Sequence, residues 1–416
     1  MVQDIELYRH LLGIVAPWTV DRVELDPTEH RVDVWAGHPP AERWPCPQCG
    51  QPLSLFDHAE ERVWRHLDSC AFQTFLHARV PRVECPQHGR LQVRVPWAEP
   101  NSRFTALFER WSIQVMQQTD TAAAAELLGI SWDEAWGIQE RAVARGLAAK
   151  PPLQLRQMGV DEKAVGHGQE YATLVYNLEK ATVEWVGEGR KKETLDGFFR
   201  SLSLEQRTAI EAVGLDMWDP FIASILEHVP SAEEKMVFDR FHIAKHANEG
   251  VDKVRKSEHR ELWASGDPTL KGSKYLWLYR GENLPEKHWD RFAALRALHL
   301  KTGRAYALKE ALAGLWDYES LGWARKYWAR WYFWATHSRL APIIEVARMV
   351  RDHLKGVLNF FTHRITNAVA EGLNSKIATI QKMAYGFRNK RHFRTAVLFR
   401  CGGLDLYPTG THTISG

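Results

Sequence analysis

The chain has 416 residues, of which 45% are hydrophobic and 25% charged, and its formal net charge is +3. These values are typical of a folded protein with several domains, and so small a net charge excludes a general electrostatic attraction to nucleic acid. The sequence contains no run of about 18 apolar residues that would predict a membrane span, and its acidic N-terminus lacks the apolar segment of a secretory signal. We therefore expect a cytoplasmic protein whose five cysteines bind metal or remain thiols instead of forming disulfides.

Residues 1–100 alternate short β-like runs with turn residues, which predicts a small β domain. Two turns of the form Cys-Pro-x-ligand-Gly lie within it, the first with Cys46 and Cys49 and the second with Cys85 and His88. Such a turn aims two ligands and two backbone amides at one ion, and its glycine permits a positive φ angle. The pattern predicts a closed, structural Zn²⁺ site, and the alternative is unrelated thiols beside a turn histidine.

Residues 101–150 predict a helix-turn-helix. The Ala-rich run 122–128 favours a helix, Gly129 can end it in the left-handed conformation, and Ser131 with Glu134 forms a capping box for a second helix. In this interpretation the second helix presents polar side chains to a DNA major groove, including Gln139, Arg141 and Arg145. The alternative is an ordinary helical hairpin with no nucleic acid nearby.

Residues 151–247 predict an α/β layer with the order three strands, helix, strand, helix, strand. One strand is expected to end at Asp161, and the apolar run 212–215 is expected to be a buried strand that ends at Asp216. Ligands gather outside the carboxyl ends of such strands, and two close carboxylates need a cation between them, so this pair predicts a Mg²⁺ site. Glu162 is left out because successive side chains of a strand face opposite ways.

Residues 248–357 predict an all-helical region that is rich in tryptophan. The segment "WARKYWARWYFW", residues 323–334, interleaves aromatic with basic side chains. We expect most of these tryptophans to pack inside the domain, and the alternative is that one or two stack on DNA bases.

Residues 358–416 predict a last helix and a basic tail. Glu371 lies at the start of this helix with Asn374 on the same face, and it would be the third carboxylate of a site for two metal ions. From Gly372 to Leu404 there are seven Lys or Arg residues and no Asp or Glu. Their side chains are expected to neutralise DNA phosphates, and the set comprises Lys376, Lys382, Arg388, Lys390, Arg391 and Arg394.

The motifs "GVDE", "GLDMWDPF", "FDRFH" and "AEGLNSKIATIQKMAYGFRN", with the paired turns and the helix-turn-helix before them, resemble those of the ISL3 family of bacterial insertion-sequence transposases. The resemblance implies a multidomain α+β chain with a zinc ribbon, a helix-turn-helix and an RNase H-like α/β catalytic core interrupted by an all-helical insertion domain. It places an Asp-Asp-Glu triad on Asp161, Asp216 and Glu371. It also implies that Asp239 and His242 buttress the core or orient DNA, although Asp239 stays open as an alternative to Asp216.

The predicted function is a DNA transposase that binds terminal inverted repeats, cleaves a strand with two Mg²⁺ or Mn²⁺ ions and joins the freed end to target DNA. We expect a dimer or larger assembly on double-stranded DNA, a structural Zn²⁺ ion, and a place near the bacterial nucleoid. The expected domains are 1–100, 101–150, 151–247, 248–357 and 358–416. The alternatives are a DNA-binding regulator with a silent core and a metal-dependent nuclease without strand transfer.

Overall fold

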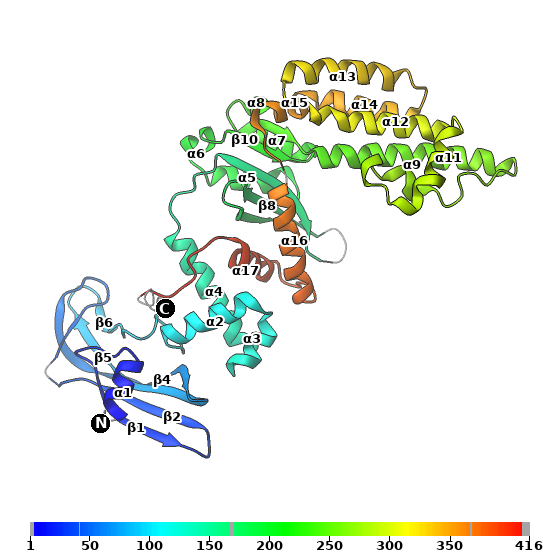
Figure 1. Cartoon of the computed structure of the whole chain (residues 1–416). Helices are drawn as coiled ribbons and strands as arrows, with labels where there is room; N and C mark the ends of the chain where they lie inside the picture. The colour runs from blue at the N-terminus through cyan, green and yellow to red at the C-terminus, as the bar shows by residue number, and fades with distance from the viewer. Residues whose placement is uncertain (1–3, 41, 167–169, 367, 410–416) are drawn as a thin grey trace. The chain divides into compact units, whose positions relative to one another are not determined.

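The computed structural model describes residues 4–40, 42–166, 170–366 and 368–409, which belong to two compact units (Figure 1). The first unit is Met1–Pro151 with Thr395–Gly416, and the second is Pro152–Arg394. Among the described helices, none combines the length and the apolar character that crossing a bilayer requires.

The first unit begins with a six-stranded sheet in the order β1-β2-β5-β4-β3, in which β6 also pairs with β5. Burial alternates along β2 with the period of two that the sequence predicts, and its inward side chains pack around Trp18, Trp64 and Trp97. The elements are α1 (Asp4–Leu11), β1 (Thr19–Asp26), β2 (Arg31–Gly37), β3 (Arg43–Pro45), β4 (Pro52–Ser69), β5 (Phe72–Cys85) and β6 (Gly89–Gln92).

Three helices follow the sheet: α2 (Ala106–Gln118), α3 (Thr121–Leu128) and α4 (Trp132–Ala149). The end of the chain returns to them, because Arg400 donates hydrogen bonds to the carbonyl oxygens of Met116 at 2.7 Å and Gln117 at 3.2 Å. Residues from Thr395 onward therefore group with the first unit, whereas the sequence analysis placed them with the core.

The second unit contains a five-stranded sheet in the order β11-β10-β7-β8-β9. The strands β7, β8 and β9 form an antiparallel meander, and β10 and β11 run parallel to β7. Every residue of β10 and β11 is buried, as a strand covered on both faces requires. The strands are β7 (Gln157–Ala164), β8 (Tyr171–Asn177), β9 (Thr182–Glu188), β10 (Ala212–Leu215) and β11 (Met236–Phe238).

Short helices connect these strands: α5 (Lys192–Arg200), α6 (Leu204–Thr208), α7 (Asp219–His228) and α8 (Ala232–Lys235). The order of the strands agrees with the sequence prediction, but each predicted single helix is followed by a second short one, α6 before β10 and α8 before β11. One boundary differs, because β7 continues three residues beyond Asp161, to Ala164. Asp161 is still paired with Leu174 of β8, which extends the strand past the expected end.

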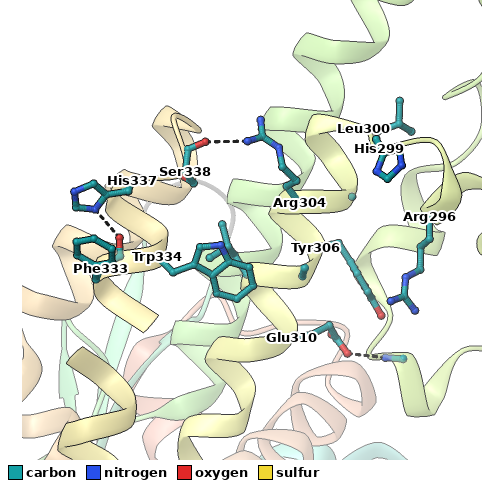
Figure 2. A pocket seen from close by; sticks show the side chains of 14 residues that line it. Arg296, His299, Leu300, Arg304, Tyr306, Glu310, Phe333, Trp334, His337 and Ser338 are labelled. Carbon is teal, nitrogen blue, oxygen red and sulfur yellow. Dashed lines mark hydrogen bonds between the residues drawn. The ribbon is translucent and has the colours of Figure 1, made fainter. Parts of the chain in front are cut away.

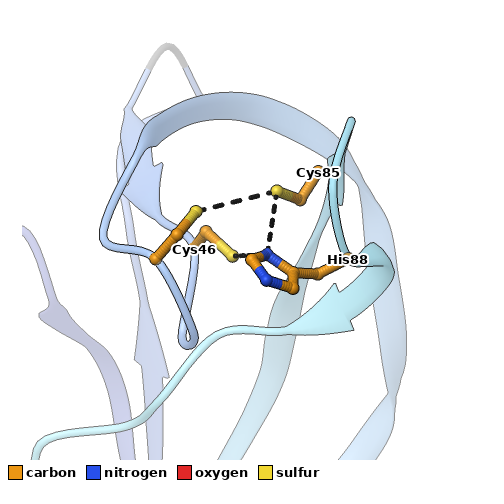
Figure 3. A group of neighbouring side chains, drawn as sticks. Cys46, Cys85 and His88 are labelled. Carbon is orange, nitrogen blue, oxygen red and sulfur yellow. Dashed lines mark hydrogen bonds between the residues drawn. The ribbon is translucent and has the colours of Figure 1, made fainter.

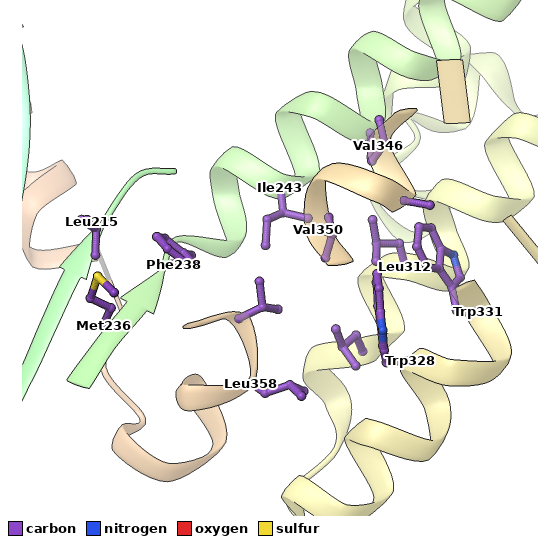
Figure 4. Packing of buried hydrophobic residues seen from close by; sticks show 14 of the residues in the cluster. Leu215, Met236, Phe238, Ile243, Leu312, Trp328, Trp331, Val346, Val350 and Leu358 are labelled. Carbon is purple, nitrogen blue, oxygen red and sulfur yellow. The ribbon is translucent and has the colours of Figure 1, made fainter. Parts of the chain in front are cut away.

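A helical region follows β11 and begins with α9, which runs from the sheet into this region (Figure 1). It shares one hydrophobic core with the sheet: Phe238, Ile243, Trp328 and Val350 belong to a single buried cluster (Figure 4). The helices are α9 (Arg240–Ala264), α10 (Lys274–Leu278), α11 (Trp289–Ala297), α12 (Lys301–Ala313), α13 (Leu321–Thr336), α14 (Ala341–Asp352) and α15 (Leu354–His363), with short 3-10 turns at Gly281–Asn283, Glu286–His288 and Gly314–Asp317.

The tryptophans of this region divide into two groups. Trp277, Trp328 and Trp331 are buried, as packing requires. Trp323 and Trp334 of the same helix α13 are 58% and 47% exposed. Trp334 lines a pocket of about 880 Å³ together with arginine, tyrosine and histidine side chains of α11 to α13 (Figure 2).

The remaining helices are α16 (Ala368–Met383) and α17 (Lys390–Cys401). Leu373, Ile377 and Ile380 form the buried side of α16, and Gln381 donates a hydrogen bond of 2.8 Å to the carbonyl oxygen of Ala164 at the end of β7. The helix that carries Glu371 therefore lies against the strand that carries Asp161.

Candidate functional site

Four side chains of the first unit converge beside its sheet (Figure 3). Cys46 follows β3, Cys85 ends β5, and the two turns also supply Cys49 and His88. The sulfur atoms of Cys49 and Cys85 lie 3.8 Å apart, and Nδ1 of His88 lies 3.7 Å from the sulfur of Cys46 and 3.4 Å from that of Cys85. Ligands about 2.3 Å from a tetrahedral Zn²⁺ ion lie about 3.7 Å from one another, so the group has the dimensions of such a site.

The backbone of the two turns has the features that the sequence predicted. Gly50 and Gly89 have φ angles of 75° and 69°. The backbone N–H groups of Cys49 and Gln48 hydrogen bond to the sulfur of Cys46 and lower its pKa to about 6. The pKa of Cys85 is lowered as well, chiefly by a backbone hydrogen bond from Gln87, whereas the hydrogen bonds and charge of Cys46 raise the pKa of Cys49. Because the thiolate is the form of cysteine that binds metal, the backbone favours this form at Cys46 and Cys85.

The helix-turn-helix has the predicted local geometry. Gly129 ends α3 with a φ angle of 62°, and Asp120 caps its start. The hydroxyl of Ser131 accepts from the N–H of Glu134, whose carboxylate accepts in return from the N–H of Ser131, which completes the capping box of α4.

The orientation of α4 differs from the prediction. Gln139 is only 3% exposed and donates to the hydroxyl of Thr121 at 2.9 Å. Arg141 and Arg145 form ion pairs with Glu109, at 2.6 Å and 3.1 Å, and Glu109 is itself 1% exposed. The expectation that these three side chains are presented outward is wrong for Gln139 and Arg145, and holds only in part for Arg141, whose side chain is 33% exposed.

The two predicted strand-end carboxylates of the second unit lie side by side. Gly159 of β7 pairs with Gly214 of β10, so Asp161 and Asp216, each two residues later, take equivalent positions on adjacent parallel strands. Their carboxylate oxygens and that of Glu162 lie within 4.8 Å of one another. The register of the parallel strands is therefore what brings the acids together.

The same register extends to the third parallel strand. Gly214 pairs with Val237, which places Asp239 beside Asp216. Asp216, Asp239 and His242 form a second group with ligand atoms within 4.8 Å, and Nε2 of His242 lies 2.9 Å from Oδ2 of Asp216. Asp239 also caps α9 by accepting a hydrogen bond of 3.0 Å from the N–H of Phe241. Asp216 is thus the carboxylate that the two groups share.

The electrostatics of the acid pair favour a bound cation. Burial and the negative charge of Asp216 raise the pKa of Asp161 to about 6. Oδ1 of Asp216 is buried and has no hydrogen-bond partner among the described residues. A buried acceptor without a partner costs about 1–3 kcal/mol, which a metal ion at this position would offset.

Glu371 lies near this pair but not in either group of close ligand atoms among the described residues. Burial and the charge of Asp239 raise the pKa of Glu371, and the charge of Asp216 acts in the same direction. Its helix is fixed to the site by Asn374, one turn later, which donates to Oδ2 of Asp161 at 2.5 Å and accepts from the hydroxyl of Tyr176 at 2.8 Å. Asn374 is therefore in contact with one of the two paired acids.

Glu162 is the residue that sequence reasoning missed. Its exclusion rested on the alternation of side chains along a strand, but its carboxylate belongs to the group of Asp161 and Asp216. The pairing of β7 with β10 ends at Gly159, whereas its pairing with β8 continues to Ala164, so Glu162 lies in the part of β7 that pairs with β8 alone among the described strands. The sequence signal that could have indicated Glu162 is its position directly after Asp161 in "GVDE".

The predicted basic residues lie on α16, on α17 and between them. Lys376, Lys382, Arg388, Arg391 and Arg394 are exposed. Lys390 is half-buried and lies 3.8 Å from a carboxylate oxygen of Glu188. The exposed members are accessible to a polyanion.

Replacing Asp161 is expected to change the response of stability to pH and metal. A folded pKa of about 6, against about 3.9 in an unfolded chain, means that the folded carboxyl holds its proton more strongly, so stability falls as pH rises from about 4 to about 6. This loss amounts to at most about 3 kcal/mol. Asp161→Asn removes this pH-dependent loss of stability, but the variant side chain also accepts one hydrogen bond fewer, worth about 1 kcal/mol.

The measurement is thermal unfolding across this pH range with and without Mn²⁺. Relative to wild type, the melting temperature of Asp161→Asn should rise with pH, and Mn²⁺ should stabilise the wild type and not the variant. Equal stabilisation of both proteins by Mn²⁺ would place the ion elsewhere.

Comparison with known proteins identifies related sequences along the chain. A transposase family model matches residues 158–397, the helix-turn-helix domain of transposase family ISL3 matches residues 93–143, and the zinc-finger of transposases IS204/IS1001/IS1096/IS1165 matches residues 42–88. The transposase for insertion sequence element IS1001 of Bordetella parapertussis is 28% identical over 395 residues, which cover 93% of this chain and 97% of that protein. The transposase for IS1557 of Mycobacterium tuberculosis is 26% identical over 446 residues, which cover 99% and 98%.

The folds and these matches define a transposase with a zinc ribbon and a helix-turn-helix DNA-binding domain. The transposase model alone covers more than half of the chain. The chain belongs to the ISL3 family of transposases.

Proposed function

We propose that this transposase binds the terminal inverted repeats of its element, cleaves a DNA strand with two divalent metal ions, and joins the freed 3′-hydroxyl to target DNA. The observation that carries the proposal is the register that sets Asp161 beside Asp216, with the helix of Glu371 tied to Asp161 through Asn374. Three antiparallel strands followed by two parallel ones support an RNase H-like core, and α9 to α15 would be its insertion.

Asp161, Asp216 and Glu371 would hold Mg²⁺ or Mn²⁺, because carboxylate oxygens are the ligands that hard cations prefer. When bound, two such ions activate an attacking hydroxyl and stabilise the leaving oxygen of a phosphodiester. Asn374 orients Asp161 by donating to its Oδ2. His242 occupies Oδ2 of Asp216 and leaves Oδ1 without a partner among the described residues, so this oxygen is the one available to a metal.

The first unit would bring the element ends to this site. Cys46, Cys49, Cys85 and His88 fit a tetrahedral Zn²⁺ ion, which would hold the turns after β3 and β5 in place. Because α4 turns Gln139 and Arg145 inward, base contacts would come from its exposed positions, and phosphate contacts from the basic residues of α16 and α17. Two element ends call for at least two protomers.

The test is a cleavage and joining assay with the full chain, a labelled duplex that carries an element end, and Mg²⁺. A transposase yields a cut strand and a product in which this strand is covalently joined to a second duplex. A cut strand that is never joined would identify a nuclease, and binding without cutting would identify a regulator. Either result contradicts the proposed function.

A further inference from the structure

Arg190 packs against two aromatic rings beside the acid pair. It follows β9, and its guanidinium carbon lies 4.0 Å from the ring centroid of Tyr171 and 5.2 Å from that of Trp218. The indole N–H of Trp218 donates a hydrogen bond of 3.2 Å to the carbonyl oxygen of Arg190. The guanidinium thus lies over two aromatic rings, a contact that holds the side chain in place and does not use its N–H donors.

The N–H edge of Arg190 is close to the acids but is not saturated by them. The carboxylate within ion-pair distance is that of Glu162, at 4.0 Å, too far for a hydrogen bond. Among the described residues the guanidinium makes no side-chain hydrogen bond, although its side chain is only 33% exposed. A half-buried guanidinium with unused donors is suited to a bidentate anion such as a phosphate group.

The space around Arg190 is large enough for a DNA backbone. A pocket of about 760 Å³ is lined by Arg190, Lys191, Lys192 and Lys390, and by Glu170, Glu188 and Glu193. Lys192 is paired with Glu227 at 2.6 Å, and Lys390 lies 3.8 Å from Glu188. The remaining charged lining residues are Arg190 and Lys191, which are positive, and Glu170 and Glu193, which are negative. A phosphate contact would therefore depend on the N–H donors of Arg190 and not on an excess of positive charge.

The position of Arg190 is coupled to that of the acid pair. Trp218 lies two residues after Asp216, and Tyr171 begins β8, the strand that pairs with β7 beside Asp161. The segments that place the carboxylates thus also place the guanidinium. A phosphate oxygen bound to its N–H edge would lie next to Glu162, whose carboxylate is within 4.8 Å of those of Asp161 and Asp216.

We propose that Arg190, packed against Tyr171 and Trp218, binds a backbone phosphate of the DNA strand next to the cleavage point and so positions this strand against Asp161 and Asp216. Arg190 is then a positioning residue, and Lys191 adds charge at the same pocket. The inference rests on the proposed function, because it assigns to that site the contact that orients its substrate.

The test combines Arg190→Ala with duplexes in which single phosphates around the cleavage point are replaced by neutral methylphosphonates. Arg190→Ala is expected to lower the single-turnover cleavage rate at saturating DNA by about 10²-fold. At one phosphate position, neutralisation should slow the wild type by a similar factor and cause little further loss in the variant. Independent, multiplicative losses at every position would overturn the proposal.

Two variants separate positioning from folding and from general charge. Arg190→Lys keeps the charge but not the bidentate edge, so it should restore affinity for DNA more than the cleavage rate. Lys180→Ala removes a cation from the turn before β9, at the opposite end of this strand, and should cleave like the wild type. If Arg190→Ala lowers the melting temperature but cleaves normally at lower temperature, the residue is only a packing element.

A binding measurement distinguishes failure of this inference from failure of the proposed function. The slope of log affinity against log salt should decrease in magnitude by about 0.9 in Arg190→Ala, because one phosphate contact is lost. Lys180→Ala should leave this slope unchanged. The measurement needs no cleavage, so it remains decisive even if the wild type proves unable to cut DNA, and an unchanged slope in Arg190→Ala would overturn the inference.

Discussion

Asp161→Asn is expected to abolish strand cleavage while leaving the chain folded and bound to DNA. The substitution keeps the shape of the side chain, and the amide of Asn374 still has an oxygen to donate to. It removes the negative charge of Asp161, which a divalent ion bound by Asp161 and Asp216 would require. Since metal ions stabilise transition-state charge by several kcal/mol, the cleavage rate should fall by about 10³-fold or more.

The measurement is single-turnover cleavage beside DNA binding for a matched set of carboxamide variants. Asp216→Asn should be as severe as Asp161→Asn, and Glu371→Gln should also abolish cleavage. Glu179→Gln, in the exposed turn before β9, is the control and should behave as the wild type. Full cleavage by Asp161→Asn would show that the metal site lies elsewhere.

Asp239→Asn resolves the question of the second acid. Asp239 caps α9, and asparagine caps helices as well as aspartate does, so this variant changes the charge with little effect on stability. If Asp216 is the second catalytic acid, Asp239→Asn should retain much more activity than Asp216→Asn. The reverse order would assign the role to Asp239, which the strand register places beside Asp216.

Removal of zinc should unfold the sheet of the first unit. The turns of Cys46 and Cys85 contact each other through the four ligand side chains, so a bound ion would be the main link between these two turns. Structural zinc sites contribute about 10–16 kcal/mol in apparent binding free energy, comparable with the entire stability of a domain. Cys46→Ser, or a strong chelator, is therefore expected to remove the cooperative unfolding transition of this unit.

Zinc content and circular dichroism provide the readout, with one ion per chain expected for the wild type. Cys70→Ser is the matched control, because Cys70 is an exposed, free thiol in the turn between β4 and β5 of the same sheet. It should bind zinc and unfold as the wild type does. A folded, metal-free Cys46→Ser protein would contradict a structural role for the ion.

Features that depend on local sequence were predictable from it. The buried run of β10, the left-handed Gly129 and the capping box at Ser131 follow from residues within one or two turns of each other. The convergence of Asp161 and Asp216 also followed, because neighbouring parallel strands set their ends side by side.

Features that depend on tertiary pairing were not predictable in the same way. The inward orientation of Arg145 is determined by Glu109 and Glu99, with which it forms ion pairs at 3.1 Å and 2.5 Å. That of Gln139 is determined by Thr121, to which it donates a hydrogen bond of 2.9 Å. The sequence of a helix does not show whether its polar side chains have buried partners in other segments. Likewise, the sequence of β7 alone does not disclose that its pairing with β10 ends at Gly159 while its pairing with β8 continues past Glu162, so the alternation rule did not place this carboxylate.

The helix α9 joins two regions that the sequence analysis treated as separate. It has 25 residues, about 37 Å of continuous helix. Its first turn holds His242 at 2.9 Å from Asp216, and Val251 and Val254 further along belong to the core shared with the helical region. Because α9 is one continuous helix, a displacement of the distant helices that pack against it would also move His242 relative to the carboxylate of Asp216.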